Sequence, residues 1–582
     1  MNTEWNLDIL YKGLDDPAYE EDINKFQQVS TEMVELVKSA QELPMKERAE
    51  KILYKMEEVE KYIVKLINYL SLSSSVDTEN GNFSAQQNRV MKIYSDMADS
   101  LFAAERMLSE IPDVDELAKE SDIVKEYTFY IKELKKEMSH RLSDEVEAMI
   151  AAMDITGGSA WENLQNYLTS TVKVDYDGGE VTLSEIRNLA YSDDATVRKA
   201  AYEAEIKCYE KIQDSVAFSL NNIKNQVTMI CEKKGYESPL AMTLEGAKMS
   251  RATLDAMMEA IEEYLPVFRK YMRHKAKKLG YENGLPWYEL FAPLGESKMK
   301  FSIDDAKEYL TTCFESFTPE MSDMMREAFE NEWIDFYPKK GKSGGAFCAG
   351  LLDYKQSRIL TNFDGTFGAV DTLAHELGHA FHNKQIENER PLNQDYPMPV
   401  AETASTFNEV FLGNYAIRNA SAEEKLALLE NNIRESNQCI VDIYSRYLFE
   451  TAVFEQCQQK FLMADDLKAI MLDAQKKAYG DGLDPEYMHP YMWVCKTHYY
   501  SSGISFYNFP YSFGNLFAEG LYAIYLKEGD SFVDKYKNML KATPTASIED
   551  IGKQMGIDLT DKKFWQDSLA LMAEQIDEFC SL

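Results

Sequence analysis

Residues 20–150 show the hydrophobic periodicity of α-helices. Apolar side chains recur every three or four positions in EMVELVKSAQELPMKERAEKILYKMEEVEKYIVKLINYL and again in NRVMKIYSDMADSLFAAERMLSEI, with Glu and Lys between them. The spacing does not sustain a seven-residue repeat. These segments therefore predict packed antiparallel helices rather than a coiled coil.

Two stretches interrupt the helical pattern and predict small β elements. The first, near 154–186, combines glycine pairs with the β-prone run TVKVDY, which predicts a turn or hairpin. In the second, at 336–368, Gly-rich turns flank two β-prone runs, Ala346–Leu352 and Arg358–Phe363. Helical periodicity returns at Ala369 and continues to the end. We therefore expect a mainly α fold with a small β-sheet next to the helix that begins there.

The length of 582 residues is enough for several hydrophobic cores or for one large enzyme body. We expect an N-terminal helical region over residues 1–115 and a helical region with a small hairpin over residues 116–200. The remaining residues, 201–582, would form the catalytic region. The chain shows no internal repeat and no low-complexity linker.

The charge balance narrows the choice of partners. The chain carries 62 basic and 98 acidic side chains, a formal net charge of −36. Phosphate backbones and anionic membrane surfaces need a basic face, so nucleic acid and membrane are disfavoured as partners. A hydrophobic content of 45% indicates a globular chain rather than a disordered one.

The cysteines and the N-terminus indicate a location. Eight cysteines are spread along the chain without a CxxC pair, which is too sparse for a disulfide scaffold. The opening MNTEWNLDILYKGLDDP lacks the basic and apolar regions of a signal peptide. No apolar run approaches the ~18 residues that span a bilayer. We therefore expect a soluble cytoplasmic protein with reduced thiols.

The strongest chemical signal is AVDTLAHELGHAFH, which holds three of the seven histidines. His375 and His379 bracket Glu376 as HExxH, the signature of zinc-peptidase helices. The i, i+4 spacing puts both imidazoles on one helix face, where they can share a tetrahedral zinc ion. Glu376 would then lie beside the zinc-bound water that it deprotonates. Two core histidines on a buried stripe are the plain alternative.

A catalytic zinc takes three protein ligands and leaves a fourth position open. The HExxHxxGxxH arrangement is absent, so a later glutamate is the other common solution. PMPVAETASTFNEVFLGNYA is helical in pattern and offers Glu402 and Glu409. Glu402 lies 27 residues after His375, enough for a helix end, a loop and a return. Several nearby polar residues could orient the imidazoles, although capping or exposure would explain each as well. These are Asp371, Ser405, Asn408 and Glu409.

A second cluster, HPYMWVCKTHYYSSGISFYNFPYSFG, holds five tyrosines and two histidines. Peptide hydrolysis forms a tetrahedral oxyanion, which a phenol or imidazole donor can stabilise. Any single tyrosine here could equally be a core aromatic with a satisfied hydroxyl.

HELGHAFH followed by VAETASTFNE resembles the thimet oligopeptidase and oligoendopeptidase F group of metallopeptidases. WNLDILYKGLDDP and KKGYESPLA extend the resemblance over nearly the full length. It implies one zinc per chain held by His375, His379 and Glu402, with Glu376 as the catalytic glutamate. It also implies an ellipsoid whose two helical halves enclose a deep channel with the metal on its floor.

The resemblance implies further site residues. FYNFPYSFG is similar to the branch's FYVYxYATG, which implies Tyr507 and Tyr511 as oxyanion donors, with His498 upstream. GKSGGAFCAG resembles the family's peptide-presenting strand. His382 matches a further family histidine that either contacts substrate or braces the site. The substrate-binding backbone would come from three consecutive residues, Gly344, Gly345 and Ala346.

The leading hypothesis is a zinc endopeptidase that hydrolyses internal bonds of short unstructured oligopeptides. A zinc carboxypeptidase or dipeptidyl-type enzyme with the same ligands remains open. A non-catalytic, metal-bearing peptide-binding protein is a third alternative, although it would need neither Glu376 nor the tyrosine cluster.

Overall fold

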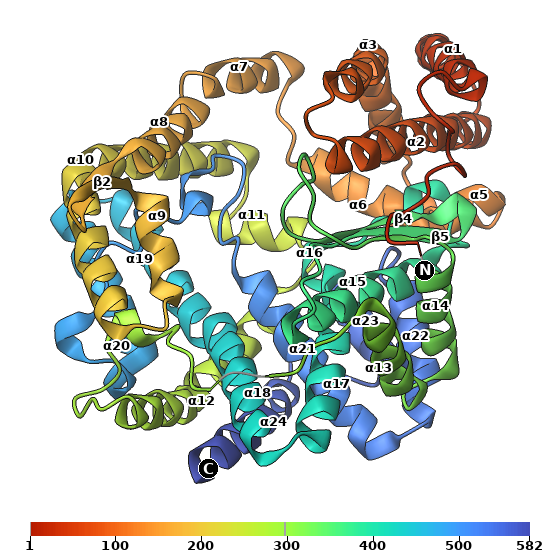
Figure 1. Cartoon of the computed structure of the whole chain (residues 1–582). Helices are drawn as coiled ribbons and strands as arrows, with labels where there is room; N and C mark the ends of the chain where they lie inside the picture. Colours follow the sequence, from red (N-terminus) through yellow and green to blue (C-terminus); the bar gives the residue numbers. More distant parts are fainter. Residues whose placement is uncertain (1, 296–297) are drawn as a thin grey trace.

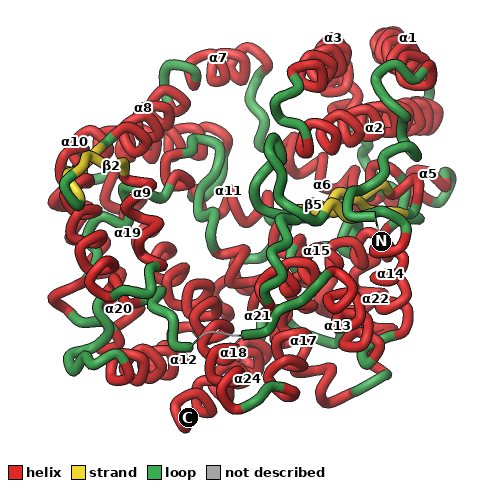
Figure 2. Tube along the Cα trace, in the orientation of Figure 1, coloured by secondary structure: helices red, strands yellow, loops and turns green. Residues whose placement is uncertain are grey.

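The computed structural model describes residues 2–295 and 298–582. Most of this chain is helical, as the sequence predicts, and the strands form two small sheets (Figure 2). No helix in these two ranges combines the length and the apolar character that a membrane crossing requires.

The N-terminal helices form one group, at the upper right of Figure 1. They are α1 (Pro17–Ala40), α2 (Met45–Val76), α3 (Gly81–Ser109), α4 (Val114–Ala118), α5 (Asp122–Glu126) and α6 (Thr128–Ser139). The first three pack on one another through apolar faces that bury Met33, Leu66 and Met97 completely. Short loops join them, so consecutive helices run antiparallel. The predicted antiparallel packing is confirmed.

The middle of the chain contains the predicted hairpin, β1 (Lys173–Tyr176) and β2 (Gly179–Thr182). Asp177 and Gly178 form its turn with φ values of 50° and 78°. Positive φ at both positions is the geometry of a type I′ turn, which Asp-Gly favours. The helices in this part of the chain are α7 (Asp144–Asp154), α8 (Gly158–Thr171), α9 (Leu183–Asn188), α10 (Ala195–Lys234), α11 (Pro239–Gly246), α12 (Arg251–Lys278), α13 (Ile303–Glu315) and α14 (Pro319–Glu330). The hairpin packs against two of them, α9 and α10.

The second sheet has the order β3-β5-β4. β4 (Phe347–Leu351) and β5 (Gln356–Leu360) pair antiparallel, with Phe347 opposite Leu360. They confirm the two β-prone runs. A third strand, β3 (Ile334–Asp335), pairs parallel to β5 and was not predicted, because two residues are too few to show a pattern.

The second sheet lies between two hydrophobic cores. The first core gathers residues from Trp5 to Leu134 and takes in Leu351 and Leu360 from the sheet. The second runs through the rest of the chain and takes in Ile359. Successive strand residues point to opposite faces, so neighbours in β5 serve different cores. The division at residues 115 and 200 stays a prediction.

The remaining helices carry the HExxH segment and what packs around it. They are α15 (Phe367–Ile386), α16 (Met398–Ala401), α17 (Thr403–Asn419), α18 (Ala422–Asn437), α19 (Ile443–Cys457), α20 (Ala464–Tyr479), α21 (Phe509–Glu528), α22 (Ser531–Ala542), α23 (Ile548–Gln554) and α24 (Lys562–Ser581). α15 packs on β4 and β5 and on α17. Thr366 caps its start by accepting a hydrogen bond from the Ala369 N–H at 3.2 Å.

Gly378 allows α15 and α17 to approach closely. A Cβ at this position would lie 2.6 Å from both the Ala404 carbonyl oxygen and the Ser405 Cα. Only a residue without a side chain fits there. This contact sets how near the histidines of α15 come to Glu402, just before α17.

Candidate active site

α15 presents His375 and His379 from one face, as their spacing predicts. Leu373, Ala374 and Leu377 bury the other face in the second core. The two imidazole rings lie 4.9 Å apart between centroids and are nearly perpendicular.

Glu402 lies at the short break between α16 and α17, which aims its side chain at α15. Its Oε2 is 3.3 Å from His375 Nε2 and 3.2 Å from His379 Nε2. Ser405 donates a hydrogen bond to the same oxygen at 2.8 Å. The ligand atoms of the three residues all lie within 4.8 Å of one another. Two imidazoles and one carboxylate are a donor set that catalytic zinc uses, so these residues fit the metal.

The electrostatics of this group also suit a cation. Burial raises the pKa of Glu402, but hydrogen bonds from both imidazoles outweigh it and leave this pKa below its usual range. Burial lowers the pKa of His375, yet hydrogen bonds to Glu402 and Glu409 raise it to about 10. Carboxylates that stabilise an imidazolium here would equally stabilise a metal ion.

Two further residues hold α15 in place. His375 Nδ1 lies 2.9 Å from Glu409 Oε1, which leaves Nε2 directed at Glu402. Asn408 donates to the Ala374 carbonyl at 3.0 Å. Burial, followed by the Glu409 carboxylate, raises the pKa of Asp371. Glu409 is therefore placed to orient His375, whereas Asp371 makes no hydrogen bond to an imidazole among the described residues.

Glu376 is 5% exposed, and the charges of His375 and His379 act on its carboxyl. Among the described residues its Oε2 has no hydrogen-bond partner. Burial raises the pKa of this carboxyl above its usual value. A buried carboxylate with a free oxygen is suited to accept a proton.

His382 is fully buried on the same helix. Its Nε2 lies 2.8 Å from Thr543 Oγ1, and its ring stacks on Tyr396 with centroids 4.2 Å apart. Burial lowers the pKa of His382 to about 3, so the ring is neutral. These contacts fit the bracing role and leave no free face for substrate.

Tyr507 and Tyr511 lie together, with hydroxyl oxygens 2.8 Å apart. The His498 ring lies 5.8 Å from the Tyr507 ring. Burial, followed by Tyr507 and Glu402, raises the pKa of Tyr511, so this phenol is protonated. The effect of Glu402 on this pKa means that the two side chains are near each other. A Cβ on Gly514, in the same helix, would lie 3.6 Å from the Glu402 Cβ. The tyrosine pair and the metal-ligand group therefore adjoin.

Two residues that the sequence did not single out position His498. Asn508 Nδ2 lies 2.6 Å from His498 Nε2, and Arg446 donates to Asn508 Oδ1 at 2.8 Å. Burial and the nearby Arg446 lower the pKa of His498 to about 3. Asn508 was detectable as the lone amide side chain within FYNFPY, whereas nothing in the sequence marks Arg446.

The Gly-rich segment leads into β4, the edge strand. Gly344 and Gly345 precede the strand, and Asn362 donates to the Gly345 carbonyl at 2.8 Å. On the edge opposite β5, the Gly350 carbonyl accepts a hydrogen bond from Asn68 at 3.2 Å. Backbone groups two residues apart point the same way, so Cys348 also faces this edge.

Comparison with known proteins agrees with this site. A family model described as peptidase family M3 matches residues 188–571, and one described as oligopeptidase F matches residues 111–173. The oligopeptidase PepF of Bacillus subtilis (strain 168) is 27% identical over 529 residues, which are 88% of this chain and 78% of that protein. An oligoendopeptidase F homolog of Lactococcus lactis (strain IL1403) is 24% identical over 99% of this chain and 96% of its own.

Solved structures share the fold. Oligoendopeptidase-F from Enterococcus faecium superposes with a TM-score of 0.69 at 20% identity, over 96% of this chain and 98% of that one. A protein assigned as a peptidase in Chlamydophila abortus gives a TM-score of 0.86 at 20% identity, over 100% and 98%. Since the M3 match alone covers more than half of the chain, this metalloendopeptidase belongs to peptidase family M3.

Proposed function

We propose that this chain is a zinc-dependent endopeptidase that hydrolyses internal bonds of short, unstructured oligopeptides. One observation carries the proposal. The ligand atoms of His375, His379 and Glu402 converge within 4.8 Å, and Glu376 keeps an unpartnered carboxylate oxygen on the same helix.

His375, His379 and Glu402 would hold one zinc ion. When bound, zinc supplies a Lewis acid that polarises a carbonyl and acidifies water. Glu409 keeps His375 in the orientation that leaves Nε2 free, through its contact with Nδ1 at 2.9 Å.

Glu376 would move the proton. Its free Oε2 accepts a proton from the attacking water and returns it to the leaving amine. The raised pKa of this carboxyl suits both tasks, because a stronger base receives the proton more readily and still releases it to an amine.

The tyrosine pair would stabilise negative charge on the substrate carbonyl oxygen. Tyr511 is protonated and 36% exposed, so its hydroxyl can turn from Tyr507 toward a substrate. Neutral His498 packs beside Tyr507 and is held by Asn508. A phenol that donates to the oxyanion acts mainly in the transition state.

The edge of β4 opposite β5, where Asn68 already binds the Gly350 carbonyl, would bind the peptide as an added strand. Strand addition requires an extended chain, and the N-terminal helices stand over the same sheet. We therefore infer that unstructured peptides of about 5 to 20 residues are cut and folded proteins are not.

The cysteines support a reducing compartment. All eight lie in the described part of the chain and all are free thiols. A cytoplasmic location is therefore part of the proposal.

A quenched peptide with a fluorophore and a quencher at opposite ends tests the function. We expect hydrolysis that stops when a chelator removes zinc and returns when about one zinc ion per chain is added. Mass spectrometry should show an N-terminal and a C-terminal fragment that meet at an internal bond of the peptide. Release of single residues or dipeptides from an end would favour the carboxypeptidase or dipeptidyl alternative, and binding without turnover would favour the non-catalytic one.

A further inference from the structure

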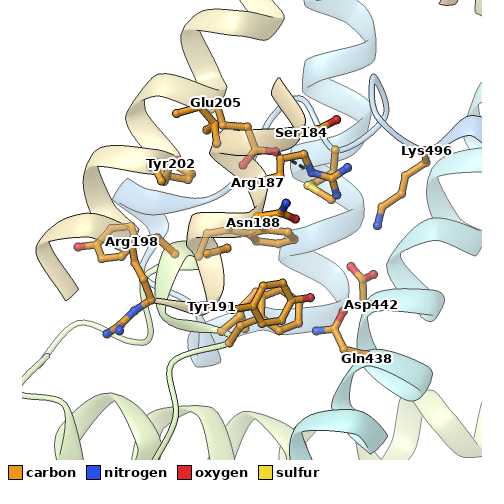
Figure 3. A pocket seen from close by; sticks show the side chains of 18 residues that line it. Ser184, Arg187, Asn188, Tyr191, Arg198, Tyr202, Glu205, Gln438, Asp442 and Lys496 are labelled. Atoms are coloured by element: carbon orange, nitrogen blue, oxygen red, sulfur yellow. Dashed lines mark ion pairs between the residues drawn. The ribbon is translucent and has the colours of Figure 1, made fainter. Parts of the chain in front are cut away.

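A cavity of about 540 Å³ lies apart from the metal-ligand group, and its walls come from distant parts of the chain (Figure 3). The walls are α9, the start of α10, the 3-10 helices Leu189–Tyr191 and Trp287–Glu289, the π-helix Gln438–Asp442, and residues 492–496. This volume is large enough for a terminal peptide segment.

Two of the cations that line the cavity are already neutralised. Arg198 donates from Nε to Glu289 Oε2 at 3.0 Å, and both side chains are buried. Arg187 Nε lies 3.4 Å from Glu205 Oε1. Neither guanidinium therefore needs an added anion.

Lys496 also lines the cavity, but it has no such ion pair among the described residues. In Figure 3 its side chain extends into the cavity above Asp442. Asp442 is itself engaged, since it pairs with Arg446 and accepts a hydrogen bond from the Tyr479 hydroxyl at 3.0 Å. Within the two described ranges no carboxylate oxygen lies within 4.0 Å of the Lys496 ammonium. Lys496 is thus the one cation of the lining without an ion pair in the described part of the chain, and burial and Arg446 lower its pKa against the effect of Asp442.

Aromatic side chains also line the cavity, together with aliphatic residues such as Leu290 and amides such as Gln438. Tyr191 and Phe291 pack with ring centroids 5.0 Å apart, and Trp287 and Tyr288 also face the cavity. A ligand that fits would combine one negative charge with an apolar or aromatic body.

The cavity adjoins the tyrosine cluster. Lys496 stands two residues before His498. Arg446 links the two sites, because it pairs with Asp442 at the cavity wall and donates to Asn508, the partner of His498. One chain of side-chain contacts therefore joins the cavity wall to His498 beside the tyrosine pair.

We propose that the cavity binds the C-terminal residue of a peptide, with its carboxylate paired to Lys496 and its side chain against the aromatic wall. This assignment rests on the proposed peptidase function, since it names where one end of the substrate lies. A peptide has a single C-terminal carboxylate, which matches the one lining cation that lacks an ion pair within residues 2–295 and 298–582.

The test compares peptides that differ only at the C-terminus. Two quenched peptides share one cleavage sequence and end in a phenylalanine acid or a phenylalanine amide. We expect the intact enzyme to favour the acid about tenfold or more in kcat/KM, the size of one charge-assisted hydrogen bond. Lys496→Met should bring the ratio of acid to amide close to one, and Lys496→Arg should keep part of the preference.

Lys477→Met is the matched control. It removes one positive charge from α20, where Lys477 pairs with Asp473 outside the cavity, and it should leave the ratio unchanged. If Lys496 only positions His498, its loss lowers turnover of both peptides equally and the ratio survives. That result, or equal use of both peptides by the intact enzyme, overturns the proposal.

A binding measurement separates this proposal from the peptidase function. Acetyl-Gly-Gly-Phe and its amide are titrated into the full-length Glu376→Gln variant by calorimetry, which needs no turnover. Tighter binding of the acid that disappears with Lys496→Met supports the cavity assignment even if the chain cleaves nothing. Equal binding of acid and amide refutes it even if the chain is an active peptidase.

Discussion

Replacing Gly378 with Ala should damage the metal site through packing alone. The new Cβ would lie 2.6 Å from the Ala404 carbonyl oxygen and the Ser405 Cα. Both atoms belong to backbone, which cannot turn aside as a side chain can. The strain is relieved only if α15 and α17 separate, and Glu402 moves with α17.

The size of the shift follows from the contact distances. Ordinary carbon contacts begin near 3.4 Å, so the two backbones must part by about 0.8 Å. Metal–ligand distances tolerate only ~0.2 Å. Zinc affinity should therefore fall by about tenfold or more, and overpacking should cost ~1–3 kcal/mol of stability.

Gly368→Ala is the control on the same helix. A Cβ there meets only the Thr366 hydroxyl, at 3.8 Å, so it should be neutral or slightly stabilising. Zinc affinity is measured by competition with a chromogenic chelator, and stability by thermal unfolding of the metal-free proteins. If Gly378→Ala binds zinc and unfolds as Gly368→Ala does, then the close approach of α15 and α17 does not hold the ligands together.

Four other substitutions test the assigned roles. Glu376→Gln should keep zinc and lose ~10²–10⁴-fold in kcat, because it removes the proton acceptor; near-normal kcat in a zinc-replete sample would contradict this. Glu402→Gln should lose zinc, measured by elemental analysis, because an amide is a poor zinc ligand; full occupancy and activity would point to Glu409 instead. Tyr511→Phe should lower kcat ~10²–10³-fold with little change in KM, and a pure KM effect would mean that the hydroxyl binds the ground state. Glu409→Gln should weaken zinc binding ~10–100-fold without abolishing it, and unchanged affinity would show that its contact with His375 is incidental.

The helix with the HExxH motif was predictable because its signal is local. Spacing alone places His375 and His379 on one face. The local sequence does not decide whether Glu402 or Glu409 is the third metal ligand, since both lie on related turns. Their difference comes from the break between α16 and α17, which directs Glu402 toward the Nε2 atoms and leaves Glu409 at Nδ1. The ligand set itself stays a prediction.

The features that escaped sequence reasoning depend on contacts between distant segments. Arg446 reaches Asn508 across 62 positions, and neither periodicity nor composition records such a contact. The cavity around Lys496 is assembled from segments between residues 184 and 496. Periodicity identifies which face of a helix is buried, but it does not identify which other segment covers that face.

The N-terminal helices that cover the second sheet also keep it from pairing with other copies of the chain. Phe347, Ala349 and Leu351 of β4 turn one face toward the N-terminal helices, while Cys348 packs against the second core. Without those helices, this apolar face would be exposed on an edge strand, and the Gly350 carbonyl would lose its hydrogen bond from Asn68 of α2. Such strands recruit neighbouring chains and seed aggregates. A fragment reduced to residues 188–571 would thus keep the candidate catalytic residues yet tend to precipitate.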